Sequence, residues 1–373
     1  MKITEVQTIP VRVPANADAI HSRGRGTPLH MLAVGASKAW RREFDELPKY
    51  IIRVRTDAGH EGIGESLRLS GKDALDDIAQ SLVGLDPRTL NLFDLPVPYG
   101  RLYDGFECAI LDLVGKIHDM PVCALLGGAW RDRVACSGWM GQKTPEDAAA
   151  TARHFHAQGF SFIKFKSTLA DDPVAQCAAI REAAPDMKVI IDPNGRWERA
   201  ADALRVTHAL RDVGNVYCLE DPIPRCDLAG WQHLRQTGGL PLAFHTHIPY
   251  VELFQKPQDP VLAWKADAVD YFNFSGPASW VMRMAHFAEL INIPFWHGSE
   301  VDLGILEACH LHVAAACKMC TLPTDVFGEA IREDDLITKP LETDGEGNYL
   351  VPQGAGLGVE LDEQALGKYQ VGQ

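Results

Sequence analysis

Hydrophobic and polar positions in the second half of the chain alternate between short apolar runs and longer segments with apolar residues at helical spacing. The runs suit strands and the segments suit helices, here expected over 145–158, 174–184 and 199–213. Each run ends in a charged or metal-capable residue, and the ends lie roughly 25 to 28 residues apart, the length of one strand-plus-helix unit. These strand ends are Lys166, Asp192, Glu220, His245, Asp270 and His297.

Two architectures produce this alternation, a closed barrel and an open doubly wound sheet. A barrel gathers all its strand ends around one mouth, which explains why every predicted strand ends in a side chain capable of chemistry. The pattern therefore favours a (β/α) barrel.

The first part of the chain, to about residue 57, has a different texture. Strand-like runs at 3–13 and 50–55 flank a long irregular segment that carries His21, Arg23 and Arg25. Long loops in compact domains are often lids, so we expect this one to close over an anionic substrate. An ordinary solvated basic loop fits the sequence equally well.

The stretch 267–300 reads as strand, helix and strand, with one apolar helix face. A crossover helix brings the ends of successive parallel strands side by side, so Asp270 and His297 are expected to touch. A carboxylate that orients an imidazole makes the histidine a general acid or base near neutral pH. A structural aspartate and a satisfied histidine are the alternative.

Lys164 and Lys166 lie two residues apart on a predicted strand, so both side chains point to one face, the interior of a barrel. Two ammonium groups held together in a dry site would lower the pKa of one until it acts as a base. A surface strand with solvated lysines is disfavoured because Phe162 shares their face. Asp192 and Glu220 follow apolar strands, and two such carboxylates at one mouth suit Mg²⁺.

The order Lys-x-Lys, Asp-x-Asn, Glu-x-Pro, then Asp and His on later strands resembles the enolase superfamily, specifically its mandelate racemase subgroup. GIGE at 62–65, ILDLVGKIHDMPVCALLGG at 110–128 and VPQGAGLGVELDE at 351–363 extend the resemblance over nearly the whole chain. It implies a (β/α)7β-type TIM barrel with an α+β capping domain. The cap would comprise residues 1–128, the barrel 129–330, and the segment 331–373 would return to the cap.

The resemblance also implies a reaction, in which a base removes the proton next to a carboxylate and a divalent metal, usually Mg²⁺, stabilises the enediolate. By matching position, Asp192 and Glu220 would bind the metal. Lys166, beside Lys164, would be the base on one face, and His297 with Asp270 would act on the other. Asn194 and Asp325 would be substrate-binding residues, together with His21, Arg23 and Arg25 of the first loop.

The chain departs from this family at the predicted fifth strand, PLAFHTHIPY at 241–250, where a third carboxylate ligand is usual. His245 and Thr246 occupy the two possible positions, and His247 shares a face with His245, so either histidine could reach the site. An imidazole ligand would favour Mn²⁺, Fe²⁺ or Zn²⁺ over Mg²⁺. A weakened or lost metal site is the alternative. NFSGP at 273–277 also replaces a basic residue and a Gly-Gly pair.

Composition narrows the class of protein. The 373 residues are 46% hydrophobic and 23% charged, typical of a globular protein, and the net charge of −14 disfavours nucleic acid or an anionic membrane as a partner. Nine scattered cysteines fit reduced thiols, with the lone CxxC of Cys317 and Cys320 assigned to helix packing. No secretory or membrane segment is visible, so we expect a cytoplasmic protein. We also expect it to form a homo-oligomer.

The leading functional prediction is a lyase that dehydrates a sugar acid of the aldonate or aldarate class to a 2-keto-3-deoxy acid, with protonated His297 assisting loss of the hydroxyl. A racemase, epimerase or cycloisomerase acting on a carboxylate substrate is the runner-up. A non-catalytic sugar-acid binding protein is the prediction from another class, supported only by the missing carboxylate.

Overall fold

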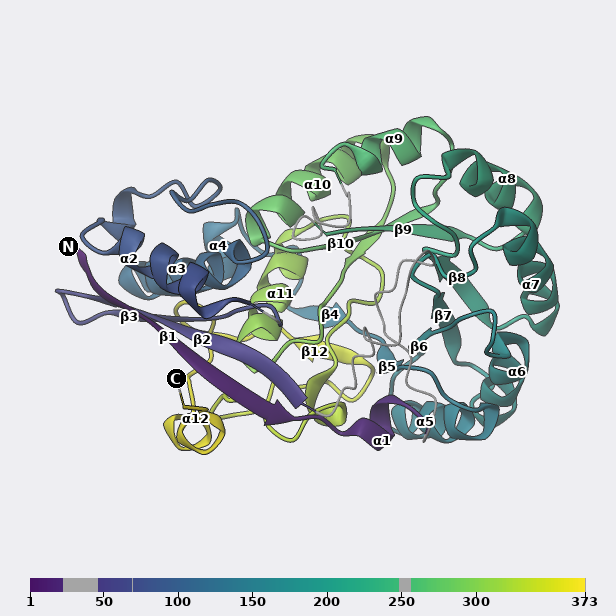
Figure 1. The fold of residues 1–373 in the computed structure, drawn as a ribbon, viewed down its shortest axis with the longest axis horizontal. Coiled ribbons are helices and arrows are strands. Elements are labelled where there is room, and N and C mark those ends of the chain that lie inside the picture. The colour runs from purple at the N-terminus through teal and green to yellow at the C-terminus, as the bar shows by residue number, and fades with distance from the viewer. Residues whose placement is uncertain (23–45, 69, 248–255, 373) are drawn as a thin grey trace.

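The computed structural model describes residues 1–22, 46–68, 70–247 and 256–372. It comprises a barrel and a smaller cap that lies against the barrel beside α10 and α11 (Figure 1). The cap contains a three-stranded antiparallel sheet in the order β1-β2-β3, covered by helices. Its elements are β1 (Ile3–Pro14), α1 (Ala17–Ile20), β2 (Glu46–Thr56), β3 (Glu61–Glu65), α2 (Lys72–Leu82), a 3₁₀ turn (Pro87–Thr89), α3 (Tyr103–His118) and α4 (Val122–Leu125).

The GIGE motif forms β3 and explains how α3 packs on the sheet. A Cβ atom at Gly64 would lie 2.1 Å from the carbonyl oxygen of Gly105, and one at Gly62 would lie 2.3 Å from that of Ala109. Only glycine allows the helix backbone to approach the strand this closely.

The barrel is a parallel seven-stranded sheet in the order β11-β10-β9-β8-β7-β6-β5, with a helix after each strand. Single parallel bridges join Phe295 to Cys320 and Cys136 to Thr324, so the segment 320–324 closes the sheet at the eighth strand position. The strands are β5 (Gly138–Met140), β6 (Phe162–Lys166), β7 (Lys188–Asp192), β8 (Val216–Glu220), β9 (Leu242–His247), β10 (Tyr271–Ser275) and β11 (Phe295–His297). The helices are α5 (Pro145–Ala157), α6 (Pro173–Ala183), α7 (Ala200–Val213), α8 (Leu228–Gly238), α9 (Asp259–Lys265), α10 (Ala278–Ile291) and α11 (Gly304–Ala316).

Local sequence signals fix where the barrel helices begin. The side chain of Thr144 accepts a hydrogen bond from the Asp147 N–H at the start of α5, and that of Asp172 accepts one from Ala175 at the start of α6. A proline follows each of these capping residues, where the missing N–H has no helical partner to lose. The predicted helices and the (β/α)7β barrel with its cap are confirmed, and helix boundaries agree within one or two residues.

The C-terminal segment contacts both parts of the molecule. After a 3₁₀ turn (Gly328–Ala330), β12 (Asn348–Leu350) pairs with β4 (Arg133–Ala135), and α12 (Glu363–Tyr369) lies under β1 (Figure 1). The Val371 N–H then donates to the carbonyl of Pro10. The domain limits at residues 128 and 330 stay predictions.

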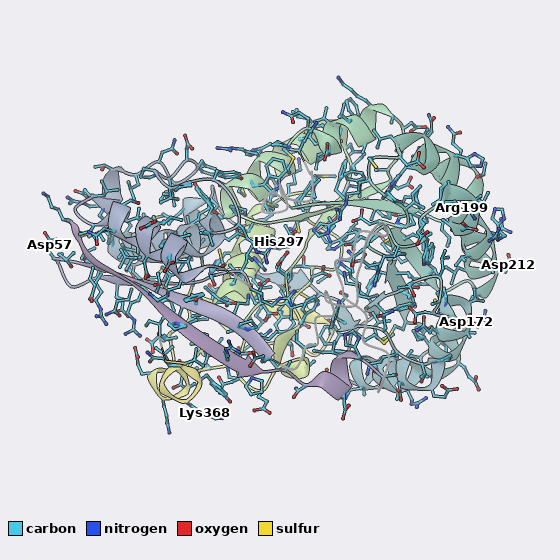
Figure 2. All side chains as sticks on the ribbon, viewed as in Figure 1. Asp57, Asp172, Arg199, Asp212, His297 and Lys368 are labelled. Atoms are coloured by element: carbon cyan, nitrogen blue, oxygen red, sulfur yellow. The ribbon has the colours of Figure 1, made fainter. Side chains whose placement is uncertain are left out.

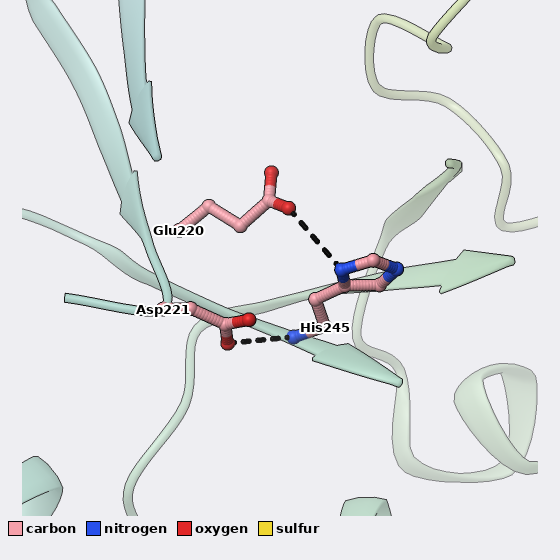
Figure 3. A group of neighbouring side chains, drawn as sticks. All are labelled: Glu220, Asp221 and His245. Atoms are coloured by element: carbon pink, nitrogen blue, oxygen red, sulfur yellow. Dashed lines mark hydrogen bonds and ion pairs between the residues drawn. The ribbon is translucent and has the colours of Figure 1, made fainter. Parts of the chain in front are cut away.

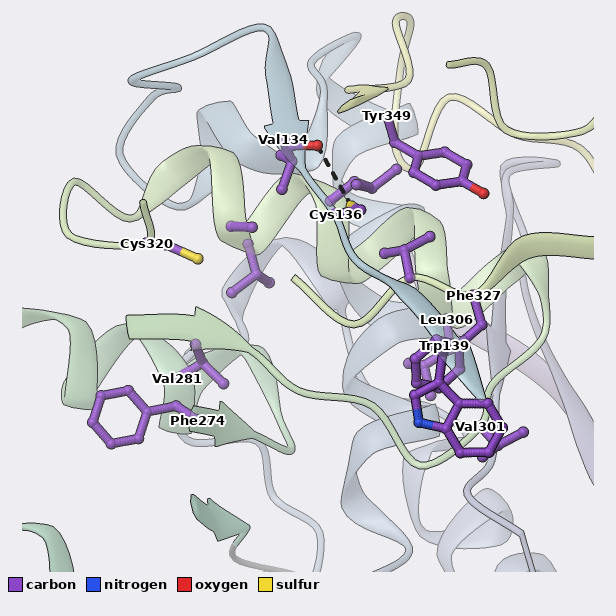
Figure 4. Packing of buried hydrophobic residues seen from close by; sticks show 14 of the residues in the cluster. Val134, Cys136, Trp139, Phe274, Val281, Val301, Leu306, Cys320, Phe327 and Tyr349 are labelled. Carbon is purple, nitrogen blue, oxygen red and sulfur yellow. Dashed lines mark hydrogen bonds between the residues drawn. The ribbon is translucent and has the colours of Figure 1, made fainter. Parts of the chain in front are cut away.

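A continuous apolar core joins these parts. Figure 4 shows Tyr349 of β12 close to Cys136 and, further along, Trp139 of β5 beside Phe327, with ring centroids 5.0 Å apart. Charged residues such as Asp57, Arg199 and Lys368 lie at the outside, whereas His297 is fully buried (Figure 2). None of the helices in the described part of the chain is long and apolar enough to cross a membrane.

Candidate active site

The carboxyl ends of β6, β7 and β8 gather four ionisable side chains inside the barrel. Lys166 is the register partner of Asp192, and Ile191 is that of Leu219, so Asp192 and Glu220 end their strands at the same level. One layer deeper the interior is apolar, formed by Ile190, Cys218, Ala243, Trp296 and Leu322. The period-2 alternation of the strands therefore places a charged layer on an apolar floor.

The two lysines are paired with carboxylates. Lys166 donates to Asp192 in a short hydrogen bond, and the Lys164 Nζ lies 2.6 Å from Glu220 and 2.7 Å from Asp325. Burial opposes the charged form of Lys164, but Asp325, Glu220 and Asp192 together raise its pKa above the ordinary value. Lys164 is thus not the lysine of the pair whose pKa is lowered, because anions surround its ammonium group.

The pKa values of the neighbouring carboxylates Asp192 and Glu220 shift in opposite directions. Burial, followed by the charge of Asp192, raises the pKa of Glu220 to about 8. Burial also acts against the charge of Asp192, but the contacts with Lys166 and Lys164 outweigh it and hold the pKa of Asp192 below its usual range. Near neutral pH, Asp192 therefore carries the negative charge and Glu220 holds a proton that a divalent cation would displace.

His245 lies beside Glu220, as Figure 3 shows. Its Nδ1 is 3.6 Å from Glu220 Oε1, its Nε2 is 2.7 Å from the Ser275 hydroxyl, and its backbone N–H donates to Asp221. Ligand atoms of Glu220, Asp221 and His245 lie within 4.8 Å of one another, a grouping that could hold a metal ion. The Asp221 carboxylate is already engaged by Arg225 and by the His245 backbone, so it serves to hold the strand ends.

The donor set fits a divalent metal. Asp192 and Glu220 are fully buried carboxyl oxygen donors that contact the same lysine, and His245 adds a buried nitrogen donor. Two carboxylates and one imidazole suit transition metals as well as Mg²⁺. Glu220, Asp192 and His245 thus remain the predicted metal ligands.

The expected Asp270–His297 dyad is wrong. Asp270 precedes β10, at the opposite end from the site, and accepts hydrogen bonds from Arg235 and from the Leu242 N–H, each at 2.9 Å. His297 pairs in register with Phe274, four residues further along, so about 13 Å of strand separates the two levels.

His297 also faces away from the lumen. Because Trp296 of β11 points into the barrel, the next residue points outward, and its ring lies 4.1 Å from that of His310 on α11. Its Nδ1 donates to the Gly298 carbonyl, and burial, with the nearby His310, lowers its pKa well below the ordinary value. A neutral, enclosed imidazole cannot supply the second acid predicted from the sequence.

The predicted substrate-binding residues are only partly assembled. Asn194 adopts a left-handed conformation (φ 50°) and its N–H donates to Asp192, while Asp325 contacts Lys164. His21 accepts a hydrogen bond from the Gln142 N–H, and burial, followed by Lys143, lowers its pKa to about 4. Arg23 and Arg25 lie outside the described residues, as does the side chain of His247. Substrate contacts by these residues stay predictions.

Two site residues were missed from the sequence, Asn273 and Ser275. The Asn273 amide donates to Glu220 Oε1 at 2.9 Å, and both residues are fully buried. Their signal was present, since they alternate with Phe272 and Phe274 in a strand whose inward positions are polar.

The fold and site define the class: a barrel enzyme whose strand ends bring two lysines, paired carboxylates and a metal-capable imidazole into one buried layer. A family model described as "Enolase C-terminal domain-like" matches residues 147–365. The chain belongs to the enolase superfamily, in the group of mandelate racemase and muconate lactonizing enzymes.

Relatives within this family have different reactions. Muconate cycloisomerase 1 of Pseudomonas putida is 28% identical, covering 86% of this chain and 89% of its own. D-galactonate dehydratase of Ralstonia nicotianae is 25% identical, covering 84% and 88%. The crystal structure of 2-chloromuconate cycloisomerase from Rhodococcus opacus superposes with a TM-score of 0.81 at 24% identity, covering 99% of both chains, which shows the shared fold.

Proposed function

We propose that this protein is a lyase that dehydrates a sugar acid of the aldonate or aldarate class to a 2-keto-3-deoxy acid. The observation that carries the proposal is the position of Lys166 against Asp192, facing a lumen whose opposite wall offers Asn273 and Ser275. A buried lysine suits removal of a proton next to a carboxylate. Neutral hydrogen-bonding side chains suit a substrate that carries hydroxyl groups.

Lys166 takes the proton from the carbon next to the substrate carboxylate. The electron pair left behind forms the enediolate, and its collapse breaks the bond between the next carbon and its hydroxyl. The ammonium group of Lys166 returns the proton to the departing hydroxyl, so water leaves from the face on which the base lies. The enol then takes a proton from solvent at the carbon that lost the hydroxyl and releases its own O–H proton, which gives the 2-keto acid.

Asp192, Glu220 and His245 would hold the divalent metal. When bound, the metal supplies positive charge for the substrate carboxylate oxygens, where the charge of the enediolate develops. Mg²⁺ follows from the family, and Mn²⁺ or a similar ion is favoured by the imidazole. Lys164 places a further buried cation beside Glu220.

A screen of aldonates and aldarates for 2-keto acid formation, with MgCl₂ or MnCl₂ added, tests the proposal. We expect turnover of at least one acid by the wild type and none by Lys166→Met. Lys188→Met is a matched control because Lys188 is exposed at the other end of a barrel strand. If no acid sugar reacted and the enzyme isomerised a different carboxylate substrate, the dehydratase assignment would be overturned.

Cycloisomerisation of an unsaturated diacid is the second candidate function, favoured by the similarity to muconate cycloisomerase 1. That reaction also needs one lysine, and lactone formation from a muconate distinguishes it. Racemisation, in contrast, needs proton transfer on both faces. Across the barrel from β6, the described residues of β10 present Asn273 and Ser275, and His297 faces outward.

The same site could bind a sugar acid without reacting, and the screen separates that outcome by measuring binding alongside turnover. Its substrate would in every case be a small carboxylate. A cytoplasmic location and a homo-oligomeric state stay predictions, the second testable by light scattering.

A further inference from the structure

Strand β10 contributes two buried polar side chains that contact the predicted ligands of two other strands. The Asn273 amide donates to Glu220 on β8, and the Ser275 hydroxyl contacts His245 on β9. The two residues are spaced by two, so both face the lumen. Asn273 is 0% exposed and Ser275 is 1% exposed, which excludes bulk water as a competing partner.

The contact with Ser275 joins one imidazole nitrogen of His245 to a hydroxyl, which is able to accept a hydrogen bond from Nε2–H. The Nε2 lies 2.7 Å from the hydroxyl oxygen, a normal hydrogen-bond length, whereas Nδ1 lies 3.6 Å from Glu220 Oε1, too far for one. Donation from Nε2–H to the hydroxyl leaves the lone pair of Nδ1 directed toward Glu220 (Figure 3). The nitrogen nearest the carboxylate is then the one able to bind a cation.

The histidine backbone is held as well. Asp221 has a left-handed conformation (φ 44°), and its carboxylate accepts the His245 N–H at 3.1 Å while also pairing with Arg225. Asn273 meanwhile occupies Glu220 Oε1 from one side, and Lys164 contacts Oε2 at 2.6 Å from the other. Both donor groups are therefore oriented before any cation arrives.

We propose that Ser275 is a positioning residue that sets the tautomer of His245 and thereby gives the site its preference for borderline divalent metals over Mg²⁺. This rests on the proposed function, because it requires that Asp192, Glu220 and His245 bind a metal. Imidazole strengthens binding of Co²⁺, Mn²⁺ or Zn²⁺ much more than binding of Mg²⁺, which prefers oxygen. Removing the hydroxyl should consequently change selectivity and not merely affinity.

The experiment measures binding of CoCl₂ and MgCl₂ to the apo-protein by calorimetry, with the visible absorption of Co²⁺ as a second readout. Ser275→Ala is expected to weaken Co²⁺ binding by about 10 to 100-fold, the usual effect of removing an outer-shell partner. Mg²⁺ binding should change much less. Ser275→Thr keeps a hydroxyl and should restore the Co²⁺ affinity and spectrum.

Thr246→Val is the matched control. Thr246 is buried on the same strand as His245 but alternates to the opposite face, and valine preserves its shape. Its Co²⁺ to Mg²⁺ affinity ratio should equal that of the wild type. In a His245→Ala background, adding Ser275→Ala should cause no further loss, because the hydroxyl acts only through the imidazole.

The outcomes are distinguishable. Unchanged Co²⁺ affinity in Ser275→Ala, or equal losses for Co²⁺ and Mg²⁺, would overturn the role of Ser275 while leaving the metal site intact. No binding of either ion by the wild type would overturn both this role and the proposed metal site. Circular dichroism of each variant separates a lost contact from a lost fold.

Discussion

Replacing Lys164 by methionine should strongly destabilise the protein, because this lysine is the internal counter-ion of the site. Its ammonium group lies 2.6 Å from Glu220, 2.7 Å from Asp325 and 3.7 Å from Asp192, and its side chain is 3% exposed. Methionine keeps the length and the apolar stem. The perturbation is thus the loss of one buried positive charge.

The magnitude follows from which carboxylate loses its partner. Asp192 keeps Lys166, and Glu220, with a pKa of about 8, is mostly protonated at pH 7. Asp325 is the carboxylate that loses its lysine, so it must stay charged without that partner or take up a proton. Protonating a carboxylate of ordinary pKa 3.8 at pH 7 costs about 4 kcal/mol, at about 1.4 kcal/mol per pH unit. Breaking a buried pair typically costs about 3–5 kcal/mol, in agreement.

The loss of folding stability in Lys164→Met should increase as pH rises. In the wild type the raised pKa of Lys164 means that its stabilising contribution is complete below the unfolded value of 10.5 and constant between pH 6 and 8. In the variant, Asp325 binds a proton in the folded state but not in the unfolded state. Stability of the variant therefore falls as pH rises, by up to about 1.4 kcal/mol per unit.

Urea unfolding of metal-free protein at pH 6, 7 and 8 measures the effect. Lys164→Met/Asp325→Asn should recover most of the loss because it removes the uncompensated charge. The control Lys318→Met breaks an exposed pair with Glu289 and should cost under about 1 kcal/mol at every pH. A loss under about 1 kcal/mol in Lys164→Met, or one independent of pH, would refute the reasoning.

Three further predictions concern the base, the metal and a buried histidine between the barrel and the cap. Lys166→Ala should lower turnover by about 10² to 10⁴-fold. It should also abolish incorporation of deuterium from D₂O at the substrate carbon next to the carboxylate. Full exchange at this carbon in the variant would show that another group is the base. His245→Glu should shift the metal preference toward Mg²⁺, measured by reactivation of chelated enzyme; an unchanged preference, or full activity after exhaustive chelation, would contradict the ligand assignment. His312 accepts from the Cys123 N–H and donates to the Leu357 carbonyl, and burial lowers its pKa to about 4. Its folded form resists protonation, so stability should fall by up to about 3 kcal/mol as pH drops from 6.5 to 4, and His312→Gln should flatten that part of the profile; an unchanged slope would exclude His312 as its source.

Much of the site could be predicted from the sequence because it depends on local periodicity. A spacing of two residues on a strand is enough to place Lys164 and Lys166 on one face, and an apolar run before a polar residue marks Asp192 and Glu220 as strand ends. The same regularity, repeated at the length of a strand-plus-helix unit, determined the barrel, and the glycines of GIGE determined where α3 meets the cap sheet.

The end and the phase of each strand were decided only by the tertiary structure. Asp270 precedes a five-residue strand that Ser275 ends, and the sequence does not say which of the two lies at the carboxyl end until the pairing of Tyr271 with Ala243 sets the register. His297 ends its strand as predicted, yet Trp296 fills the barrel interior and turns the histidine outward. Because a shift of one residue exchanges the two faces of a strand, packing of one large side chain determined which neighbour reaches the site.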